Sequence, residues 1–373
     1  MTKHKVSIVS CKDYTPELVQ EAVNKSVKLL GGIESLIKPK STVLLKPNVL
    51  MSASPESGIT THPEVLRAVI RLLKPLECRI VAGDSPSAWG KYINNVNEVY
   101  AQSGITRVCK EEGVELVLFG PKRFYNNIPL TAWIGDCDYI INIPKFKTHG
   151  MMLMTAAVKN LFGLVCGSFK TELHKKYFRP SDFAAMLLDI YKSANPVINI
   201  VDGIVAMEGD GPATSGKLRQ EKIIVAGSDA LAVDYILALI MGIDPLSVPV
   251  NKEAKRIGML DFVKSDIQVL GEPLEKVIGR KFLLPKTAMS QKLPEPVARF
   301  IMSFIKYRPY IDASKCIQCF ACIKACPKQV IIFENTKMCF DYKKCIACFC
   351  CQEVCPKAAV KVKKSLLARL IGL

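Results

Sequence analysis

Residues 316–327 read Cys-Ile-Gln-Cys-Phe-Ala-Cys-Ile-Lys-Ala-Cys-Pro, and residues 345–356 read Cys-Ile-Ala-Cys-Phe-Cys-Cys-Gln-Glu-Val-Cys-Pro. Both stretches follow the pattern C-x-x-C-x-x-C-x-x-x-C-P, and each cysteine of the second lies 29 positions after its counterpart in the first. Asp312 and Asp341 keep the same offset. The two stretches are therefore an internal duplication.

This spacing suits the chemistry of iron–sulfur clusters. Three thiolates at two-residue gaps can wrap one cuboidal 4Fe–4S cluster, while the cysteine before proline points to the other cluster. Zinc sites favour paired C-x-x-C units with a longer gap, and disulfides do not fit a chain without a secretory signal. We therefore predict two crossed clusters: Cys316, Cys319, Cys322 and Cys355 in cluster one, and Cys345, Cys348, Cys351 and Cys326 in cluster two.

Residues 309–363 resemble the two-cluster bacterial-type ferredoxin family, which implies a small α+β domain. Short strands are expected beside the repeats, at Val330–Phe333 and Ala359–Val362. Cys339 and Cys350 fall outside the pattern. For Cys350, next to a ligand, a packed thiol is favoured over a contact with a cluster sulfide.

Composition limits the classes of function. The 373 residues, 49% of them apolar, allow two or three domains, and the longest apolar stretch, Leu231–Ile243, is too short for a membrane span.

The net charge is +17, and residues 286–373 hold 16 Lys+Arg against 5 Asp+Glu. Metal-bound thiolates would balance part of that excess, and aromatic residues do not interleave with the basic runs, which argues against nucleic acid. Without a secretory segment near Met1, we expect a cytoplasmic protein.

Before residue 285, short hydrophobic runs alternate with longer amphipathic stretches. This alternation is typical of βαβ units and predicts an α/β domain with a mostly parallel sheet and flanking helices. Strands are expected at Val6–Val9, Thr42–Leu45, Arg79–Ala82, Leu116–Phe119, Tyr139–Ile143, Val197–Val201 and Ile223–Ala226, and helices near residues 16–30, 63–74, 95–111, 181–193 and 229–241.

Polar and ionisable residues follow four of these strands. Ligands of open α/β sheets bind outside the carboxyl ends of the strands. Asp, Asn, Gly and Pro also follow strands because they form turns, but turns do not call for lysine. Converging ammonium groups favour phosphate or carboxylate ligands. The predicted anion site comprises Lys46, Asn48, Asp84, Ser85, Lys145, Lys147, His149, Lys159, Asn160, Asp202, Glu208, Gly209 and Gly211.

Two questions about this site stay open in the sequence. Asp84, Asp202 and Glu208 either hold a magnesium ion or, the favoured alternative, pair with the lysines. His149 is either an acid–base group or an anion donor.

The strand-end motifs resemble domain-of-unknown-function family 362 over most of residues 6–245. The resemblance rests on Lys46-Pro47-Asn48, Thr61-His62-Pro63, Gly83-Asp84-Ser85-Pro86, Pro144 to His149, Thr155 with Lys159-Asn160, Asp202-Gly203, Met207 to Pro212 and Ala226 to Asp229. It implies an α/β domain that often carries a C-terminal ferredoxin domain, but no agreed reaction.

The expected organisation has four parts: an α/β domain at 1–285, a linker with an apolar helix at 286–308, the ferredoxin domain at 309–363, and a basic amphipathic tail at 364–373. The tail is expected to pack on its own domain rather than on a membrane surface. The favoured function is an iron–sulfur oxidoreductase acting on an anionic substrate or a cofactor such as a flavin or deazaflavin. The alternative is an electron-delivery or reductive-activation protein that docks a redox partner enzyme.

Overall fold

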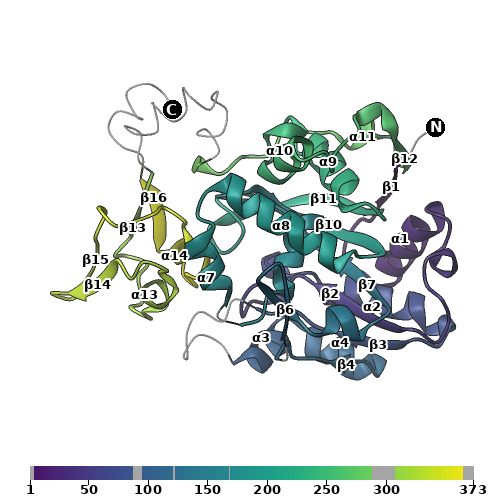
Figure 1. Ribbon diagram of the computed structural model, residues 1–373, viewed down its shortest axis with the longest axis horizontal. Coiled ribbons are helices and arrows are strands. Elements are labelled where there is room, and N and C mark those ends of the chain that lie inside the picture. The colour runs from purple at the N-terminus through teal and green to yellow at the C-terminus, as the bar shows by residue number, and fades with distance from the viewer. Residues whose placement is uncertain (1–3, 87–94, 121, 168, 288–306, 364–373) are drawn as a thin grey trace.

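The computed structural model describes residues 4–86, 95–120, 122–167, 169–287 and 307–363. They form a large α/β domain and a small C-terminal domain that lies at one end of it (Figure 1). The predicted apolar segment Val297–Ile305 and the predicted basic tail at 364–373 lie outside the described residues. Within the described ranges, every helix is too short or too polar to cross a bilayer.

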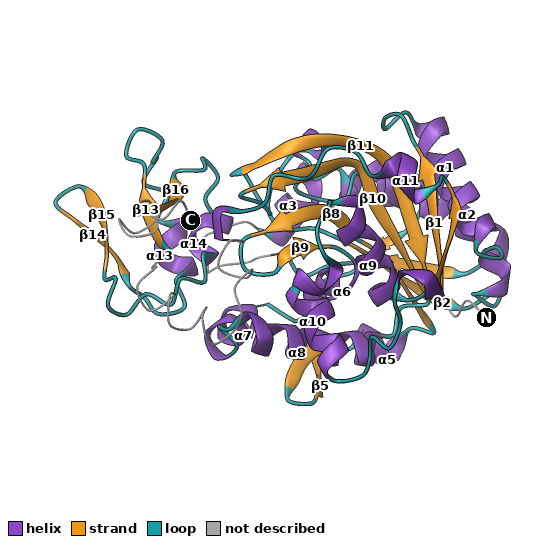
Figure 2. Ribbon diagram, turned by 90° about the horizontal axis from the view of Figure 1, so that it is seen from above, coloured by secondary structure: helices purple, strands orange, loops and turns teal. Residues whose placement is uncertain are grey.

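One large sheet runs through the α/β domain (Figure 2). Its main path has the order β12-β1-β11-β10-β7-β2-β3-β4, and only β11 runs antiparallel to its neighbours. The mostly parallel sheet predicted from the sequence is thus confirmed. Its strands are β1 (His4–Ser10), β2 (Thr42–Pro47), β3 (Arg79–Ala82), β4 (Glu115–Leu116), β7 (Tyr139–Ile143), β8 (Lys145–His149), β9 (Leu153–Thr155), β10 (Ile198–Gly209), β11 (Gly216–Gly227) and β12 (Ile267–Gly271).

Both faces of the sheet are buried, which explains the uninterrupted apolar runs in its strands. Val43 and Leu45 of β2 pack into one core and Leu44 into the other, because successive side chains point to opposite faces. The first core is covered by α1 (Pro16–Leu29), α2 (Pro63–Leu73), α3 (Val96–Gln102) and α4 (Ile105–Glu112), and the second by α6 (Ala157–Asn160), α8 (Pro180–Ala194), α9 (Ala230–Ile240) and α10 (Pro249–Arg256).

Several elements differ from their predicted form, and the predicted strand Leu116–Phe119 is only the two-residue β4 (Glu115–Leu116). The predicted helix at 95–111 is broken at Gly104, whose φ of 76° places it in the left-handed region, so that α3 and α4 are separate. β10 and β11 each extend to 12 residues because they pair with each other beyond the parallel sheet. The segment Lys145–His149, predicted as a loop after a strand, forms β8 beside β10.

Smaller elements complete the chain. In the α/β domain these are the hairpin β5 (Lys122–Tyr125) and β6 (Ile128–Thr131), and helices α5 (Trp133–Asp136), α7 (Phe169–Lys176) and α11 (Leu274–Val277). The small domain pairs β13 (Arg308–Ile311) with β16 (Val360–Lys363), and β14 (Ile331–Glu334) with β15 (Lys337–Phe340). Its helices, α13 (Ala321–Ala325) and α14 (Cys350–Glu353), occupy equivalent places in the two repeats.

Candidate functional site

The cysteines of the first repeat meet the last cysteine of the second. Cys316, Cys319, Cys322 and Cys355 line one cavity. Burial, together with repulsion from the thiolates of Cys355, Cys319 and Cys316, raises the pKa of the Cys322 thiol to about 11. These four cysteines therefore face a common cavity.

The predicted ligands of the second set are also neighbours. Burial raises the pKa of the Cys351 thiol well above its ordinary value, and the nearby thiolates of Cys348, Cys322, Cys326 and Cys345 raise it further. Iron ions would remove this repulsion, so the residues present fit two iron–sulfur clusters, which supply one-electron redox chemistry. The individual ligand assignments stay predictions that this geometry fits.

The cysteine before proline accepts an equivalent backbone hydrogen bond in each repeat. The amide of Val330 donates a hydrogen bond to Cys326 Sγ at 3.4 Å, and the amide of Ala359, 29 positions later, donates to Cys355 Sγ at 3.1 Å. Hydrogen bonds to ligand sulfur influence cluster potential. The duplication therefore extends from the ligands to the groups around them.

A buried cavity of about 60 Å³ lies beyond the carboxyl ends of β2, β3 and β7. We call it the basic cavity, because lysines from three segments reach it. Its lining comprises Asn48, Val49, Leu50, Asp84, Lys147, Thr155, Lys159, Asn160, Phe162, Gly163, Lys170, His174, Pro212 and Glu353.

One lysine beside the basic cavity is already paired. Lys46 Nζ lies 3.0 Å from Asp84 Oδ1, and both side chains are buried. Asp84 also accepts a hydrogen bond from the amide of Val49 at 2.7 Å. Gly163 packs against this pair, since a Cβ there would lie 2.0 Å from Asp84 Oδ1. Lys46 and Asp84 therefore form an ion pair, as favoured from the sequence over a magnesium site.

Lys147 has a different environment. Its Nζ donates to Asn48 Oδ1 at 2.8 Å and to the carbonyl of Ile59 at 2.6 Å, and within the described ranges it forms no ion pair. Burial lowers the pKa of Lys147 well below its ordinary value, and repulsion from Lys159 and Lys145 adds to that effect. An anion in the cavity would stabilise the charged form of Lys147 against both its burial and the repulsion from the other lysines.

Two further lysines add positive charge to the basic cavity. Lys170 of α7 donates to the carbonyl of Ser85, and burial lowers the pKa of its ammonium group to about 8. Burial also lowers the pKa of Lys159, whereas the nearby Glu353 raises it. Three lysines, Lys147, Lys159 and Lys170, thus line the cavity with two carboxylates. One of these carboxylates, Asp84, is already paired with Lys46, so the cavity favours a further anion.

Lys145 does not line the basic cavity. Its Nζ lies 2.8 Å from Asp202 Oδ2 and donates to the Tyr14 hydroxyl at 2.6 Å, while that hydroxyl donates to Asp202 Oδ1 at 2.8 Å. Asp202 also accepts from the amide of His62 at 2.9 Å. Lys145 and Asp202, predicted as anion ligands, therefore form a separate buried ion pair that joins β8 to β10.

The small domain reaches the cavity through α14. Glu353 Oε1 lies 3.3 Å from Nε2 of the buried His149. His149 Nδ1 accepts from the amides of Met151 and Met152 at 3.1 and 3.3 Å. Burial, together with the charges of Lys159 and Lys147, lowers the pKa of His149 well below its ordinary value.

Three further predicted residues, Glu208, Gly209 and Gly211, are not part of the lining of the basic cavity. Glu208 pairs with Arg280 at 2.7 Å and with Arg219 at 3.3 Å. The carbonyl of Gly209 accepts from the hydroxyl of Thr148 at 2.8 Å, and a Cβ on Gly211 would lie 2.5 Å from the carbonyl oxygen of Thr148.

The side chains of Ser85 and Asn160 also bond to backbone groups. The hydroxyl of Ser85 accepts from the amide of Gly167 at 3.2 Å, and the Asn160 amide donates to the carbonyl of Lys46 at 3.2 Å. The three carboxylates considered for magnesium, Asp84, Asp202 and Glu208, each pair with different cations.

Three ionisable residues that line the cavity, Lys170, His174 and Glu353, were not among the predicted site residues. Lys170 and His174 are spaced i, i+4 and so share one face of α7, a signal that was present. Glu353 was detectable by aligning the two repeats, because its counterpart 29 positions earlier is Lys324. The opposite charges of Lys324 and Glu353 show that the two repeats differ at this position, where only the second contributes to the basic cavity.

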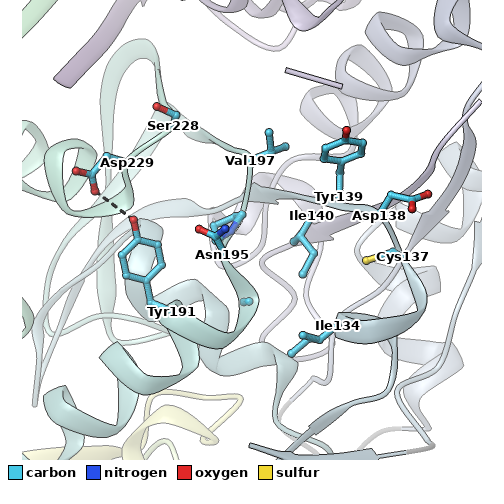
Figure 3. A pocket seen from close by; sticks show the side chains of 12 residues that line it. Ile134, Cys137, Asp138, Tyr139, Ile140, Tyr191, Asn195, Val197, Ser228 and Asp229 are labelled. Carbon is cyan, nitrogen blue, oxygen red and sulfur yellow. Dashed lines mark hydrogen bonds between the residues drawn. The ribbon is translucent and has the colours of Figure 1, made fainter. Parts of the chain in front are cut away.

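A wider surface pocket of about 480 Å³ opens at the opposite edge of the sheet (Figure 3). Tyr139 at the start of β7 and Val197 before β10 line it, and across it the Tyr191 hydroxyl donates to Asp229 at 3.2 Å. This pocket lies at the amino ends of two parallel strands, whereas α/β sheets bind ligands at the carboxyl ends. The basic cavity is therefore the better candidate.

Comparisons with known proteins agree with this division of the chain. The family described as Domain of unknown function (DUF362) matches residues 43–238, and a 4Fe-4S dicluster domain matches residues 308–356. A thylakoid-associated protein of Synechocystis sp. is 30% identical over 323 residues, which cover 83% of this chain and 98% of that protein.

A solved structure is also similar in part. It is the lactate racemase apoprotein from Thermoanaerobacterium thermosaccharolyticum, with a TM-score of 0.40 and 12% identity. The match covers 65% of this chain and 58% of the racemase chain, a little over half of its length.

Proposed function

We propose that this chain, which belongs to the DUF362 family and carries a 4Fe–4S dicluster domain, is an iron–sulfur oxidoreductase. Electrons pass through its two clusters to or from a small anionic substrate, bearing phosphate or carboxylate, in the basic cavity. Lys147, Lys159 and Lys170 bind the anion, and Asn48 orients Lys147.

A single observation carries this proposal: one side chain belongs to both sites. Glu353 lines the basic cavity, yet it follows the predicted cluster-two ligand Cys351 by two residues and precedes the cluster-one ligand Cys355 by two. The Thr214 hydroxyl donates to the carbonyl of Cys355 at 2.6 Å and ties the same turn to the α/β domain. A substrate in the cavity would therefore lie next to the cluster region.

The volume of the cavity sets the size of the ligand. Sites for drug-sized ligands and cofactors occupy roughly 300–1,000 Å³, whereas the basic cavity holds about 60 Å³. We therefore propose a small anion, or the anionic end of a larger molecule, in preference to a whole flavin or deazaflavin. Magnesium is not needed to neutralise that anion, because the lysines already supply the positive charge.

The second candidate is the electron-delivery protein. It predicts that the basic cavity is a rigid support for the ferredoxin domain and that the substrate belongs to a partner enzyme. The excess of lysines over carboxylates at the cavity favours the oxidoreductase, because a purely structural site would pair its charges. For the location in the cell we propose the cytoplasm. The Synechocystis relative is a thylakoid-associated protein, which supports a competing proposal, association with a membrane system.

Mass spectrometry of bound small molecules separates the two functions. Protein purified without oxygen should release a phosphate- or carboxylate-bearing compound in near-stoichiometric amount. The Lys147→Met variant should release at least ten times less, because it loses a charge-assisted contact worth about 1.5–3 kcal/mol. If wild type and variant both release no anion while the clusters are complete, the electron-delivery function is correct.

A further inference from the structure

The two repeats of the ferredoxin domain are covered to different extents. Ile317 and Phe320 in the first repeat are 57% and 37% exposed, whereas Phe349, the counterpart of Phe320, is 8% exposed. Among the eight predicted ligands, all of which are described, only Cys319 is exposed, and its counterpart Cys348 is half-buried. The surface around Cys319 and Phe320 is therefore more open than the equivalent surface around Cys348 and Phe349.

That open surface is apolar. Ile332 and Phe333 of β14 are 46% and 39% exposed, and the rings of Phe333 and Phe320 lie 5.2 Å apart between centroids. We call Ile317, Phe320, Ile332 and Phe333 the cluster-one patch. The β14–β15 hairpin lies on the side of the small domain away from the α/β domain, while α14 lies on the near side (Figure 1).

The border of the patch is basic. Lys315 and Lys357 are exposed and line the same cavity as Cys319, and within the described part of the chain neither pairs with a carboxylate. Lys344, the counterpart of Lys315 in the second repeat, lies 3.6 Å from Asp341. The two lysines beside Cys319 are therefore available to contact an acidic partner.

We propose that the cluster-one patch is the docking surface for a small acidic electron-carrier protein. An apolar centre with a basic border is complementary to an acidic protein that has its own exposed redox centre. One electron passes between cluster one and that centre, and no bond or proton is exchanged. This inference rests on the ferredoxin domain and not on the basic cavity, so the two proposals fail independently.

Electron exchange with an acidic plant-type [2Fe–2S] ferredoxin tests the docking surface. Dithionite-reduced protein, freed of excess reductant, is mixed in a stopped-flow instrument with excess oxidised ferredoxin at low ionic strength. The double variant Lys315→Glu/Lys357→Glu should exchange electrons at least tenfold more slowly and lose most of the salt dependence. The matched control Lys343→Glu/Lys344→Glu carries the same change in net charge on the second repeat and should stay within twofold of wild type.

Iron content and reduction by dithionite should be equal in all three proteins, which shows that the clusters are intact. Two results would overturn the proposal. The first is that the two double variants slow exchange equally, which would make the effect one of net charge alone. The second is that wild type forms a dimer in sedimentation experiments that Lys315→Glu/Lys357→Glu abolishes, which would assign the patch to a second copy of this chain.

Discussion

Replacing Lys145 with methionine should lower the melting temperature by about 6–20 °C and leave anion affinity nearly unchanged. The substitution leaves the buried Asp202 carboxylate without its cation, and breaking a buried pair costs about 3–5 kcal/mol. Tyr14 and the amide of His62 still donate to Asp202, which places the expected loss at the lower end of this range.

Replacing Lys147 with methionine should have the opposite effect: anion affinity should fall, while the melting temperature should change little. Lys147 has no carboxylate partner among the described residues, so its loss relieves an unpaired buried charge while removing hydrogen bonds to Asn48 and Ile59. We expect a melting temperature within about 3 °C of wild type and a sulfate affinity lower by about ten- to a hundredfold.

Calorimetric titration with sulfate and thermal melts of both variants check this pair of expectations. The two lysines are two positions apart on β8 and differ in what they contact, so each serves as the other's control. A large stability loss in Lys147→Met with unchanged sulfate binding would make the basic cavity a purely structural feature.

Cys326→Ala should remove cluster two and spare cluster one. In the crossed arrangement Cys326 lies with Cys345 and Cys351, so iron content should fall from about eight to about four atoms per chain. Cys339→Ala is the matched control, because Cys339 is an exposed thiol outside both repeats and should keep all the iron.

Electron paramagnetic resonance of the reduced variants identifies the cluster that is lost. Cys348→Ala removes a residue of the second triplet and should abolish the same signal as Cys326→Ala. If Cys326→Ala instead abolishes the signal that Cys319→Ala abolishes, the ligands are not crossed.

The fold and the ferredoxin domain were predictable because they depend on local patterns. The cysteine spacing predicts the 4Fe–4S dicluster domain, and apolar runs such as Val43–Leu45 predict buried strands. The break at Gly104 was harder to predict, because glycine inside a helical pattern does not by itself require a left-handed residue. The antiparallel extension of β10 and β11 depends on long-range pairing that no local pattern shows.

The site was predictable only in outline. From their positions after strands, Lys46, Asp84 and Lys147 were predicted to lie near one another, and in the structure they do. The sequence does not show that Lys46 forms an ion pair, whereas Lys147 forms none among the described residues. That distinction depends on the register of neighbouring strands and on the fit of Gly163 against the pair. Glu353 enters from another domain, and only the tertiary fold places it beside His149.

An anion in the basic cavity and cluster two should influence each other, because Glu353 lines the cavity and lies two residues after the predicted ligand Cys351. Potentiometric titration monitored by electron paramagnetic resonance, with and without saturating sulfate, measures this coupling directly. Bound anion should lower the midpoint potential of the cluster lost in Cys326→Ala by tens of millivolts, where about 59 mV corresponds to a tenfold change in affinity between redox states. The shift should be smaller for cluster one and absent in Lys147→Met. Equal potentials with and without bound sulfate, or a larger shift in cluster one, would contradict the coupling between the basic cavity and cluster two.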